Sequence, residues 1–580
     1  MIRLTRSSAK AKALALLGAA AIVGCASGGV DGAAPSPAGG GTSSGGGAAA
    51  TTGGSSALGG NSGASTVVAS DPGRVTMHRL NLAEYDNTMR DLLGTKVRAS
   101  ADFKFPVDDR GSDFDNTADV LTVSPLHLAS YNTAAIALVS AAMAAPAQRS
   151  LLVACDLAAG GASCARTGLE GFVPRAWRRA VTPAEVDNLM ALVTLATSKG
   201  DSVETGFQLA VRAALLSPNF IYRPEIDPMP SSLTPHAVSD YELASRVSYF
   251  LWSSMPDDAL LAAAKAGNLH EATTLASQVK RMLADPKAQA LVDNFAGQWM
   301  YIRLIDEATP NTQLFPQFDA GLRSAFKAES QLLFREVAFN GLPADQLLTA
   351  KFTFANDRLA KFYGLPPVGS DQPKRVDLSN SPDRRGFLAH GGLLTVNSHS
   401  DRTSPVRRGK YVLTQMLCTE IPPPPPTVNT TLEPDSTGQK TLRQVLEAHV
   451  TNPLCATCHS RMDPIGFGME GYDAIGSART MDGTLPVDTT GTLPTGEQFK
   501  GLLELSEIIG KNPAFSQCLA TKLYTYALGR GLVLGDPKHL DPVTVKSIAT
   551  EFSKNGLQFQ DLVAGVITSP TFLNRRGEGG

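Results

Sequence analysis

The chain has 580 residues, which is enough for several domains, and its formal net charge is −2. Charged residues make up only 18% of it and no long basic run is present, so nucleic acid is excluded as an expected partner. Aromatic residues are scarce at 6%, and Ala, Leu and Val dominate the apolar set. This mixture favours helices over β-sandwiches. We therefore expect a mainly α fold, built as a multi-domain body of helical bundles.

The N-terminus predicts export. Basic residues among the first twelve precede a short apolar run over 13–24, which is too short to span a membrane as a stable helix. The run ends in Ile22-Val23-Gly24-Cys25, which resembles the lipobox whose cysteine becomes the lipidated first residue of a bacterial lipoprotein. Residues 1–24 are therefore predicted to be a lipoprotein signal peptide. The alternative is an ordinary secretory signal that contains a chance cysteine.

Residues 25–72 are predicted to be a flexible tether. They consist largely of Gly, Ser, Ala and Thr, and such a segment cannot bury enough apolar surface to fold. A tether directly behind a lipid on Cys25 would let a globular body reach away from a membrane. We expect a lipid-anchored protein of the bacterial cell envelope, in the periplasm or at the cell surface.

Apolar residues at helical spacing predict helices throughout the body. Val75–Gly94 contains a capping box at Asn81 and Glu84, and Ser124–Ala144 reads as a second helix. Two more are expected over Pro183–Ser198 and Val203–Leu216. The predicted domains are an N-terminal helical domain (73–150), a helical hairpin (165–228), a central helical domain (233–368), a domain with a CxxCH motif (380–485) and a C-terminal helical domain (495–576).

One segment of the chain is repeated. Phe207–Arg223, "FQLAVRAALLSPNFIYR", resembles Phe559–Arg575, "FQDLVAGVITSPTFLNR", and the offset of 559 − 207 = 352 also maps Arg178 onto Arg530. The match predicts a duplicated helical hairpin that serves as a pseudo-symmetric scaffold. In each copy we expect Ser-Pro to stop a helix and the following Phe to fill the core.

The seven cysteines divide by role. Cys25 is assigned to lipid and two others to the CxxCH motif, which leaves Cys155, Cys164, Cys418 and Cys518. In an oxidising compartment an even remainder predicts two disulfides. Cys155 and Cys164 bracket a short loop and are expected to pair locally, and Cys418 and Cys518 then pair by elimination. The alternative is that they are free buried thiols.

The most specific motif is Cys455-Ala-Thr-Cys458-His459. Thiols three positions apart lie on one helix face and can bond the two vinyl groups of one haem, and the adjacent imidazole can ligate the iron. Two alternatives to haem are disfavoured. A thioredoxin-like pair needs a βαβ setting, which is absent, and a zinc site needs a fourth ligand. A plain disulfide between Cys455 and Cys458 is the alternative that is left. The motif predicts covalent haem c in a C-terminal cytochrome c-like module.

The residues after the motif bear on the iron ligands. Asp463 to Gly466 is predicted to be a loop, and the Pro464 carbonyl is a candidate acceptor for the His459 Nδ1–H. Met469 and Met481 are candidates for the sixth, distal ligand. A distant histidine such as His399, or an open site, is the alternative, and an open site would permit peroxide or O₂ chemistry.

The body also resembles the planctomycete-type cytochrome c proteins, a multi-domain family of secreted or lipoprotein chains, over about Thr76 to Arg576. The resemblance implies a secreted haem protein with haem at Cys455, Cys458 and His459, but it supplies no substrate. The chain departs from the family at Ala478, where an aromatic residue is common before Arg479, a candidate partner for a haem propionate. The matching motifs are "HRLNLAEYDNTMRDLLG", "RAWRRAVTPAE", "LLSPNFIYRPE", "FANDRLAKFYGLP", "RTSPVRRGKYVL", "PPPPP", "CATCHSRMDPIGFGMEGYDAIG", "KLYTYALGRGL" and "ITSPTFLNR".

Three functions follow as hypotheses. The first is electron transfer through a single haem to an unknown redox partner. The second is a haem-dependent oxidase or peroxidase-like enzyme, whose pocket the N-terminal helical domains would shape. The third is a surface binding or scaffold protein with a structural CxxC clip. The first two predict a reversible redox signal, and only the second predicts turnover at an open sixth site.

Overall fold

The computed structural model describes residues 70–73, 77–423, 439–451 and 453–578. The predicted signal peptide, the lipidation site at Cys25 and nearly all of the predicted tether lie outside these residues. Everything described belongs to one compact unit that begins at Thr66.

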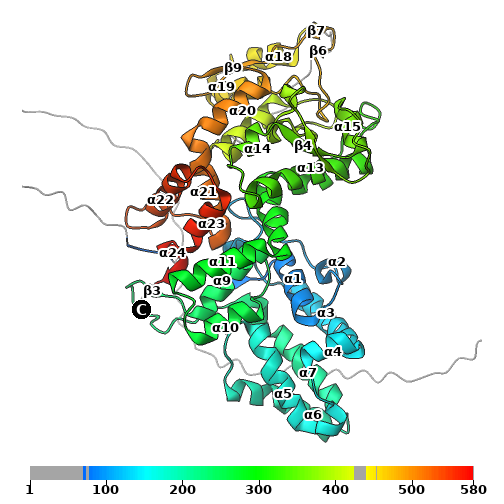
Figure 1. Ribbon diagram of the computed structural model, residues 1–580, viewed down its shortest axis with the longest axis vertical. Helices are drawn as coiled ribbons and strands as arrows, with labels where there is room; N and C mark the ends of the chain where they lie inside the picture. Colours follow the sequence, from blue (N-terminus) through cyan, green and yellow to red (C-terminus); the bar gives the residue numbers. More distant parts are fainter. Residues whose placement is uncertain (1–69, 74–76, 424–438, 452, 579–580) are drawn as a thin grey trace, which may run out of the picture. The chain divides into compact units, whose positions relative to one another are not determined.

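The fold is mainly α, as predicted (Figure 1). Helices α1 to α24 make up most of the described residues, and ten short strands pair into five two-stranded antiparallel sheets. The strands are β1 (His78–Arg79) with β2 (Tyr222–Arg223), β3 (His236–Ala237) with β10 (Asn574–Arg575), β4 (Phe352–Ala355) with β5 (Lys374–Asp377), β6 (Met481–Asp482) with β7 (Leu485–Pro486), and β8 (Thr490–Thr492) with β9 (Gln498–Lys500).

The first hydrophobic core is built by the N-terminal helices, with Tyr85, Phe172 and Phe207 among its fully buried side chains. The predicted capping box at Asn81 and Glu84 is formed. Helix α3 is long and apolar enough to cross a membrane, but half of it is buried against the core, as in core helices of soluble proteins. The helices are α1 (Leu82–Leu93), α2 (Ala99–Asp102), α3 (Pro125–Ala144), α4 (Pro146–Leu152), α5 (Leu157–Trp177), α6 (Pro183–Ser198), α7 (Val203–Leu216) and α8 (Pro218–Ile221).

The second core is larger and joins the central and C-terminal helices, with Trp252, Trp299 and Tyr524 deeply buried in it. Its first helix is capped by the box at Ser239 and Glu242. The helices are α9 (Asp240–Trp252), α10 (Asp258–Ala266), α11 (Ala272–Ala284), α12 (Gly297–Trp299), α13 (Ala320–Phe339), α14 (Gln346–Thr349), α15 (Asp357–Tyr363), α16 (Gly391–Val396), α17 (Pro405–Tyr411), α18 (Leu442–His449), α19 (Pro453–Phe467), α20 (Gly501–Lys511), α21 (Pro513–Leu528), α22 (Asp541–Lys554), α23 (Phe559–Ile567) and α24 (Pro570–Leu573).

Two glycines let α17 and α19 cross at close range. A methyl group on Gly409 would lie 1.9 Å from the Met462 carbonyl oxygen, and one on Gly466 would lie 2.0 Å from the Pro405 carbonyl oxygen. Any larger residue would force the backbones apart. This crossing fixes the helix that carries the CxxCH motif against the rest of the second core.

Both predicted disulfides are present. Cys155 is bonded to Cys164, and Cys418 is bonded to Cys518 of α21. The second bond closes a separation of 100 residues. It joins the segment behind α17 to the C-terminal helices.

The two similar segments have the same local structure. The first copy (207–223) forms α7, α8 and β2, and the second copy (559–575) forms α23, α24 and β10. Ser217 and Ser569 cap the short helices α8 and α24, and Phe220 and Phe572 are fully buried. Each copy ends in a strand that pairs with a histidine-containing strand, β1 or β3.

The predicted equivalence of Arg178 with Arg530 is wrong at the level of contacts. Arg178 donates to the carbonyl oxygens of Asn219, Phe220 and Tyr222 in the first copy. The same three positions of the second copy, Thr571, Phe572 and Asn574, accept from Arg246.

Arg530 instead forms an ion pair with both oxygens of Asp541. The sequence offset aligned two arginines that follow helices. It missed the one that binds the repeated turn, because Arg246 reaches that turn from α9.

Candidate haem-attachment site

Helix α19 carries the whole CxxCH motif. Cys455 is buried and Cys458 is half-buried, and they are the free cysteines of the described part of the chain. They are three positions apart, so their side chains lie on one face of the helix. Because the other four described cysteines are bonded in pairs, this pair alone keeps thiols for covalent attachment.

The ring of His459 is held by Asp463, one turn further along α19. The Nδ1 atom lies 3.0 and 3.1 Å from the two carboxylate oxygens. If Nδ1–H donates to Asp463, the lone pair on Nε2 is left for a metal ion. The spacing of His459 and Asp463 could have predicted this contact, because residues four positions apart share a helix face.

The predicted acceptor, the Pro464 carbonyl, is wrong, and so is the predicted loop. Helix α19 continues through Pro464 to Phe467. A helical carbonyl points toward the C-terminus, away from the preceding turn that holds His459. The Pro464 carbonyl lies instead against Gly491 of β8.

Burial and charge set the electrostatics of the pair. The side chain of Asp463 is 2% exposed, and this burial raises the pKa of its carboxyl group, against the opposing charges of His459 and His449. The hydrogen bond that His459 donates to Asp463 raises the pKa of His459 above its ordinary value. A carboxylate in this position also makes the imidazole a stronger metal ligand.

A cavity of about 630 Å³ lies beside His459. Phe467 and Phe499 supply apolar surface to it, and Arg443 and Lys500 supply positive charge. The Arg443 guanidinium stacks 4.6 Å from the centre of the Phe467 ring. A porphyrin needs apolar contacts for its ring and cations for its propionates, so these residues fit haem, whereas Cys455 and Cys458 are not among the residues that line the cavity.

The structure adds a residue that sequence reasoning missed. The ring of His449, at the end of α18, lies 5.1 Å from the ring of His459, centre to centre. Met469 is buried in the second core and Met481 is 46% exposed on β6, and neither lines the cavity beside His459. No local pattern predicts the approach of His449, because it depends on how α18 folds back on α19.

The side chain of Arg479 already binds acidic residues of the chain. Its guanidinium forms ion pairs with Glu470 at 2.7 Å and with Asp482 at 3.2 Å. Glu470 also pairs with the fully buried Arg408, which donates to the carbonyl oxygens of Met469, Tyr472 and Asp473. This network fixes the segment behind α19 to α17.

Five family models match the chain, and each is described as a protein of unknown function: DUF1587 over residues 78–144, DUF1595 over 164–225, DUF1592 over 238–365, DUF1588 over 384–482 and DUF1585 over 495–572. Their short names, PSD and PSCyt, are those of the planctomycete cytochrome c domains. The chain belongs to the planctomycete-type cytochrome c family. No curated protein and no solved structure matches it.

Membership in the planctomycete-type cytochrome c family and the two disulfides together indicate an extracytoplasmic protein. Within the family match, the model named PSCyt3 spans the CxxCH motif, α17 and α19. The PSCyt3 match therefore includes His459 and Asp463 on one wall of the cavity, and residues between 490 and 504 supply the rest of its lining.

Proposed function

We propose that the chain is a cell-envelope lipoprotein that transfers electrons through one covalently bound haem c. Cys455 and Cys458 would bond its vinyl groups, and His459 would ligate its iron through Nε2. When bound, haem c supplies reversible one-electron chemistry. The observation that supports this best is the free thiol pair beside a histidine whose ring is oriented by the buried Asp463.

The chain's own residues prepare the site. Asp463 accepts the Nδ1–H of His459 and keeps the Nε2 lone pair directed away from α19's own carboxylate. Phe467 and Phe499 supply apolar surface for the ring of a bound haem. Arg443 and Lys500 offset negative charge on a bound group.

The membrane is the proposed location. The lipobox before Cys25 and the tether to residue 72 support a lipid anchor on the envelope. Replacement of Cys25 by Ala should release the protein from membranes or block its maturation, as measured by membrane fractionation and mass spectrometry. Unchanged processing and membrane attachment of the variant would reject the anchor and leave the haem proposal intact.

A haem-dependent oxidase or peroxidase-like enzyme is the second candidate. The observation that favours it is the position of Met469 and Met481, neither of which lines the cavity beside His459. An open sixth position would admit a small oxidant. Such an enzyme would turn over peroxide or O₂ with a reductant, whereas an electron carrier would only change oxidation state.

The test is the visible spectrum of the full-length protein made in cells with cytochrome c assembly machinery. We expect a pigment that stays attached after acid denaturation, since thioether bonds do not depend on the fold. Replacement of Cys455 and Cys458 by Ala should abolish it, and replacement of Cys155 and Cys164 by Ala is the matched control that should retain it. A colourless wild-type protein from these cells would overturn the proposal and favour the scaffold hypothesis.

A further inference from the structure

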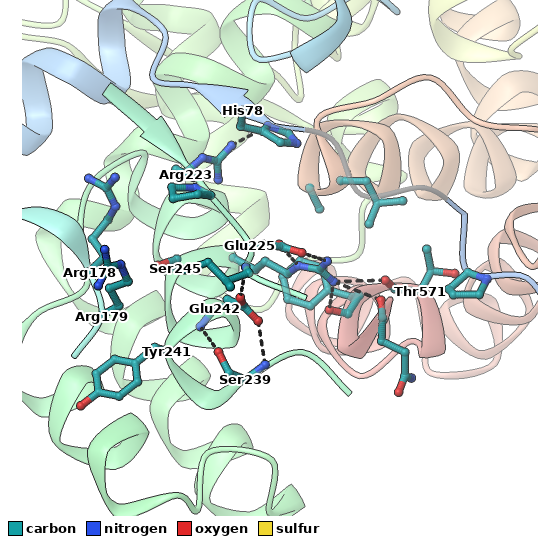
Figure 2. Close-up of a pocket in the computed structure, with 18 of the residues that line it drawn as sticks. His78, Arg178, Arg179, Arg223, Glu225, Ser239, Tyr241, Glu242, Ser245 and Thr571 are labelled. Atoms are coloured by element: carbon teal, nitrogen blue, oxygen red, sulfur yellow. Dashed lines mark hydrogen bonds and ion pairs between the residues drawn. The ribbon is translucent and has the colours of Figure 1, made fainter. Parts of the chain in front are cut away.

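A second cavity, of about 260 Å³, is lined by residues of both copies of the repeat and by other segments of the chain (Figure 2). Arginines line it from several elements: Arg178 behind α5, Arg223 on β2, Arg246 on α9 and Arg530 behind α21. The two copies of the repeat can be compared position by position, which shows what each arginine binds.

In the second copy, the charges of the two arginines at the turn, Arg246 and Arg575, are neutralised by carboxylates of the chain. Arg246 holds the turn carbonyls and forms a two-point ion pair with Glu225, at 2.6 and 2.7 Å. Arg575 on β10 pairs with Asp227 at 3.2 Å, and His236 on β3 binds the same carboxylate at 2.9 Å.

In the first copy, Arg178 holds the equivalent turn, but its other contacts are the Ala176 carbonyl and the Tyr249 hydroxyl. Among the described residues, no carboxylate lies within ion-pair distance of Arg178. The Tyr249 hydroxyl is neutral, since burial raises the pKa of that group. The carboxylate that acts on the charge of the buried Arg178 guanidinium is the more distant Glu84, which also lies near Arg223.

Arg223 takes the position of Arg575, and His78 takes the position of His236. Arg223 donates to the Nδ1 atom of His78 at 2.8 Å, where the second copy has Asp227 against its histidine. The carboxylate near Arg223 is Glu84, at 3.5 Å, and Glu84 is also bound to the Asn81 backbone N–H. The Nε atom of Arg223 is buried and has no hydrogen-bond partner.

The residues around His78 also carry positive charge, and they lower its pKa. Burial lowers the pKa of His78 well below its ordinary value, and the charges of Arg223, Arg246 and Arg530 lower it further. His78 is therefore neutral and adds no charge of its own. Its Nδ1 atom accepts from Arg223, so its proton is on Nε2.

We propose that this cavity binds the oxyanion group, a carboxylate or a phosphate, of a small metabolite. That group would occupy the place against Arg223 that Asp227 occupies against Arg575 in the second copy. Arg178 would contribute its charge rather than a hydrogen bond, since both of its terminal nitrogens already donate to the chain. Arginine recognises such groups through paired N–H donors. The cavity volume sets the size of the ligand to a compact anion with a short carbon chain.

The test is anion binding to the full-length protein by isothermal titration calorimetry and thermal unfolding. Inorganic phosphate, succinate and citrate are the probes, with sodium chloride at equal ionic strength as the reference. We expect saturable heat and a rise in Tm with at least one probe, because a ligand that binds only the folded state stabilises it. Phosphate alone would identify a phosphate site, and succinate or citrate alone would identify a carboxylate site.

Three variants locate the response. Arg223→Gln should weaken binding at least tenfold, and Arg575→Gln, its counterpart in the second copy, should bind as the wild type does. Ser245→Asp, on the cavity wall (Figure 2), supplies an internal carboxylate and should raise Tm without anion and abolish the saturable response. The absence of saturable binding by the wild type to every probe would overturn the proposal, as would equal affinity in Arg223→Gln. If Arg223→Gln does not fold, undiminished binding by Ser245→Asp is the contradicting result.

Discussion

The imidazole of His459 and the carboxylate of Asp463 are hydrogen-bonded across one turn of α19, with 3.0 Å between Nδ1 and the nearer oxygen. The carboxylate is buried, so the bond is shielded from water, whereas the ring is about one-fifth exposed at the cavity. The helix itself therefore supplies both the nitrogen that we propose binds the iron and the group that orients it.

Asp463→Asn should retain covalent pigment but weaken the bond from His459 to iron. The loss of such a partner typically costs a ligand 10- to 100-fold in affinity. In an acid titration of the haem protein, detachment of His459 should therefore begin about one to two pH units higher, and the reduction potential should rise. Thr457→Ala, on the exposed face of the same helix, is the control. Identical acid transitions and potentials in Asp463→Asn and wild type would show that the pair has no effect on the iron.

If haem is bound, His449 is expected to supply the second protein ligand to its iron. The ring of His449 is 5.1 Å from that of His459, centre to centre, although none of His449, Met469 and Met481 is among the residues that line the cavity. His449→Ala should convert low-spin to high-spin iron and let the reduced protein bind carbon monoxide, as read by visible and electron paramagnetic resonance spectra. Met469→Leu and Met481→Leu should leave both spectra unchanged. Loss of a near-infrared sulfur–iron band in either methionine variant would assign that methionine instead.

The two disulfides should differ in their contribution to stability. They close sequence separations of 100 and 9 residues. In the chain-entropy description, replacement of Cys418 and Cys518 by Ser should cost roughly 4–5 kcal/mol, and replacement of Cys155 and Cys164 should cost less than ~3 kcal/mol. Urea unfolding of both double variants measures this, and non-reducing peptide mapping verifies each pair. Equal losses would reject loop size as the cause.

Burial of Glu329 should make stability fall as pH rises. Burial raises its pKa from 4.5 to about 7, although it accepts hydrogen bonds from Thr353 and Tyr363. Between these values the folded chain keeps a proton that the unfolded chain releases. This contribution is therefore complete below pH 4.5 and is lost as the pH approaches 7.

Glu329→Gln cannot ionise, so its stability relative to wild type should increase over this pH range by up to about 3 kcal/mol. Urea unfolding at several pH values from 4 to 8 measures the difference. The neighbouring His390 gives the opposite slope, because burial lowers its pKa to about 3, and it is present in both proteins. A difference that does not vary with pH would contradict the assignment.

The crossing of α17 and α19 should tolerate no side chain at Gly409. Gly409→Ala places a methyl group 1.9 Å from the Met462 carbonyl oxygen, so the helices must separate, and we expect a loss of at least ~3 kcal/mol. Gly171→Ala is the matched control, since Gly171 is exposed in α5 and has nothing within 4 Å of the added methyl. The control should be neutral or stabilising by about 0.5–1 kcal/mol. Similar unfolding curves for both variants would reject the close crossing.

Local signals predicted much of this structure. The helices over Pro183–Ser198 and Val203–Leu216 have the predicted bounds, because a capping residue precedes each one. Both disulfides also followed from counting cysteines. The end of the helix that carries the CxxCH motif could not be predicted, because a proline such as Pro464 normally ends a helix. Here the helix continues past Pro464, where it packs against α17 through Gly409 and Gly466.

What sequence reasoning missed depends on contacts between distant segments. Arg246 holds carbonyl groups more than 300 positions away, and nothing near it in the sequence indicates them. His449 approaches His459 only because α18 folds back on α19. The cavity lined by Arg178 and Arg223 is formed by six separate stretches of chain, so no motif marks it.

The pairing of β3 with β10 has a consequence for how the protein folds. The strand partner of His236 is Arg575, close to the last described residue, whereas the partner of His78 is Arg223. The first core can therefore assemble while the rest of the chain is still emerging from the export machinery. The second core stays incomplete, with Arg246 lacking the turn carbonyls that it binds, until β10 pairs with β3. A premature stop or a bulky C-terminal fusion should leave a soluble N-terminal part attached to an aggregation-prone remainder.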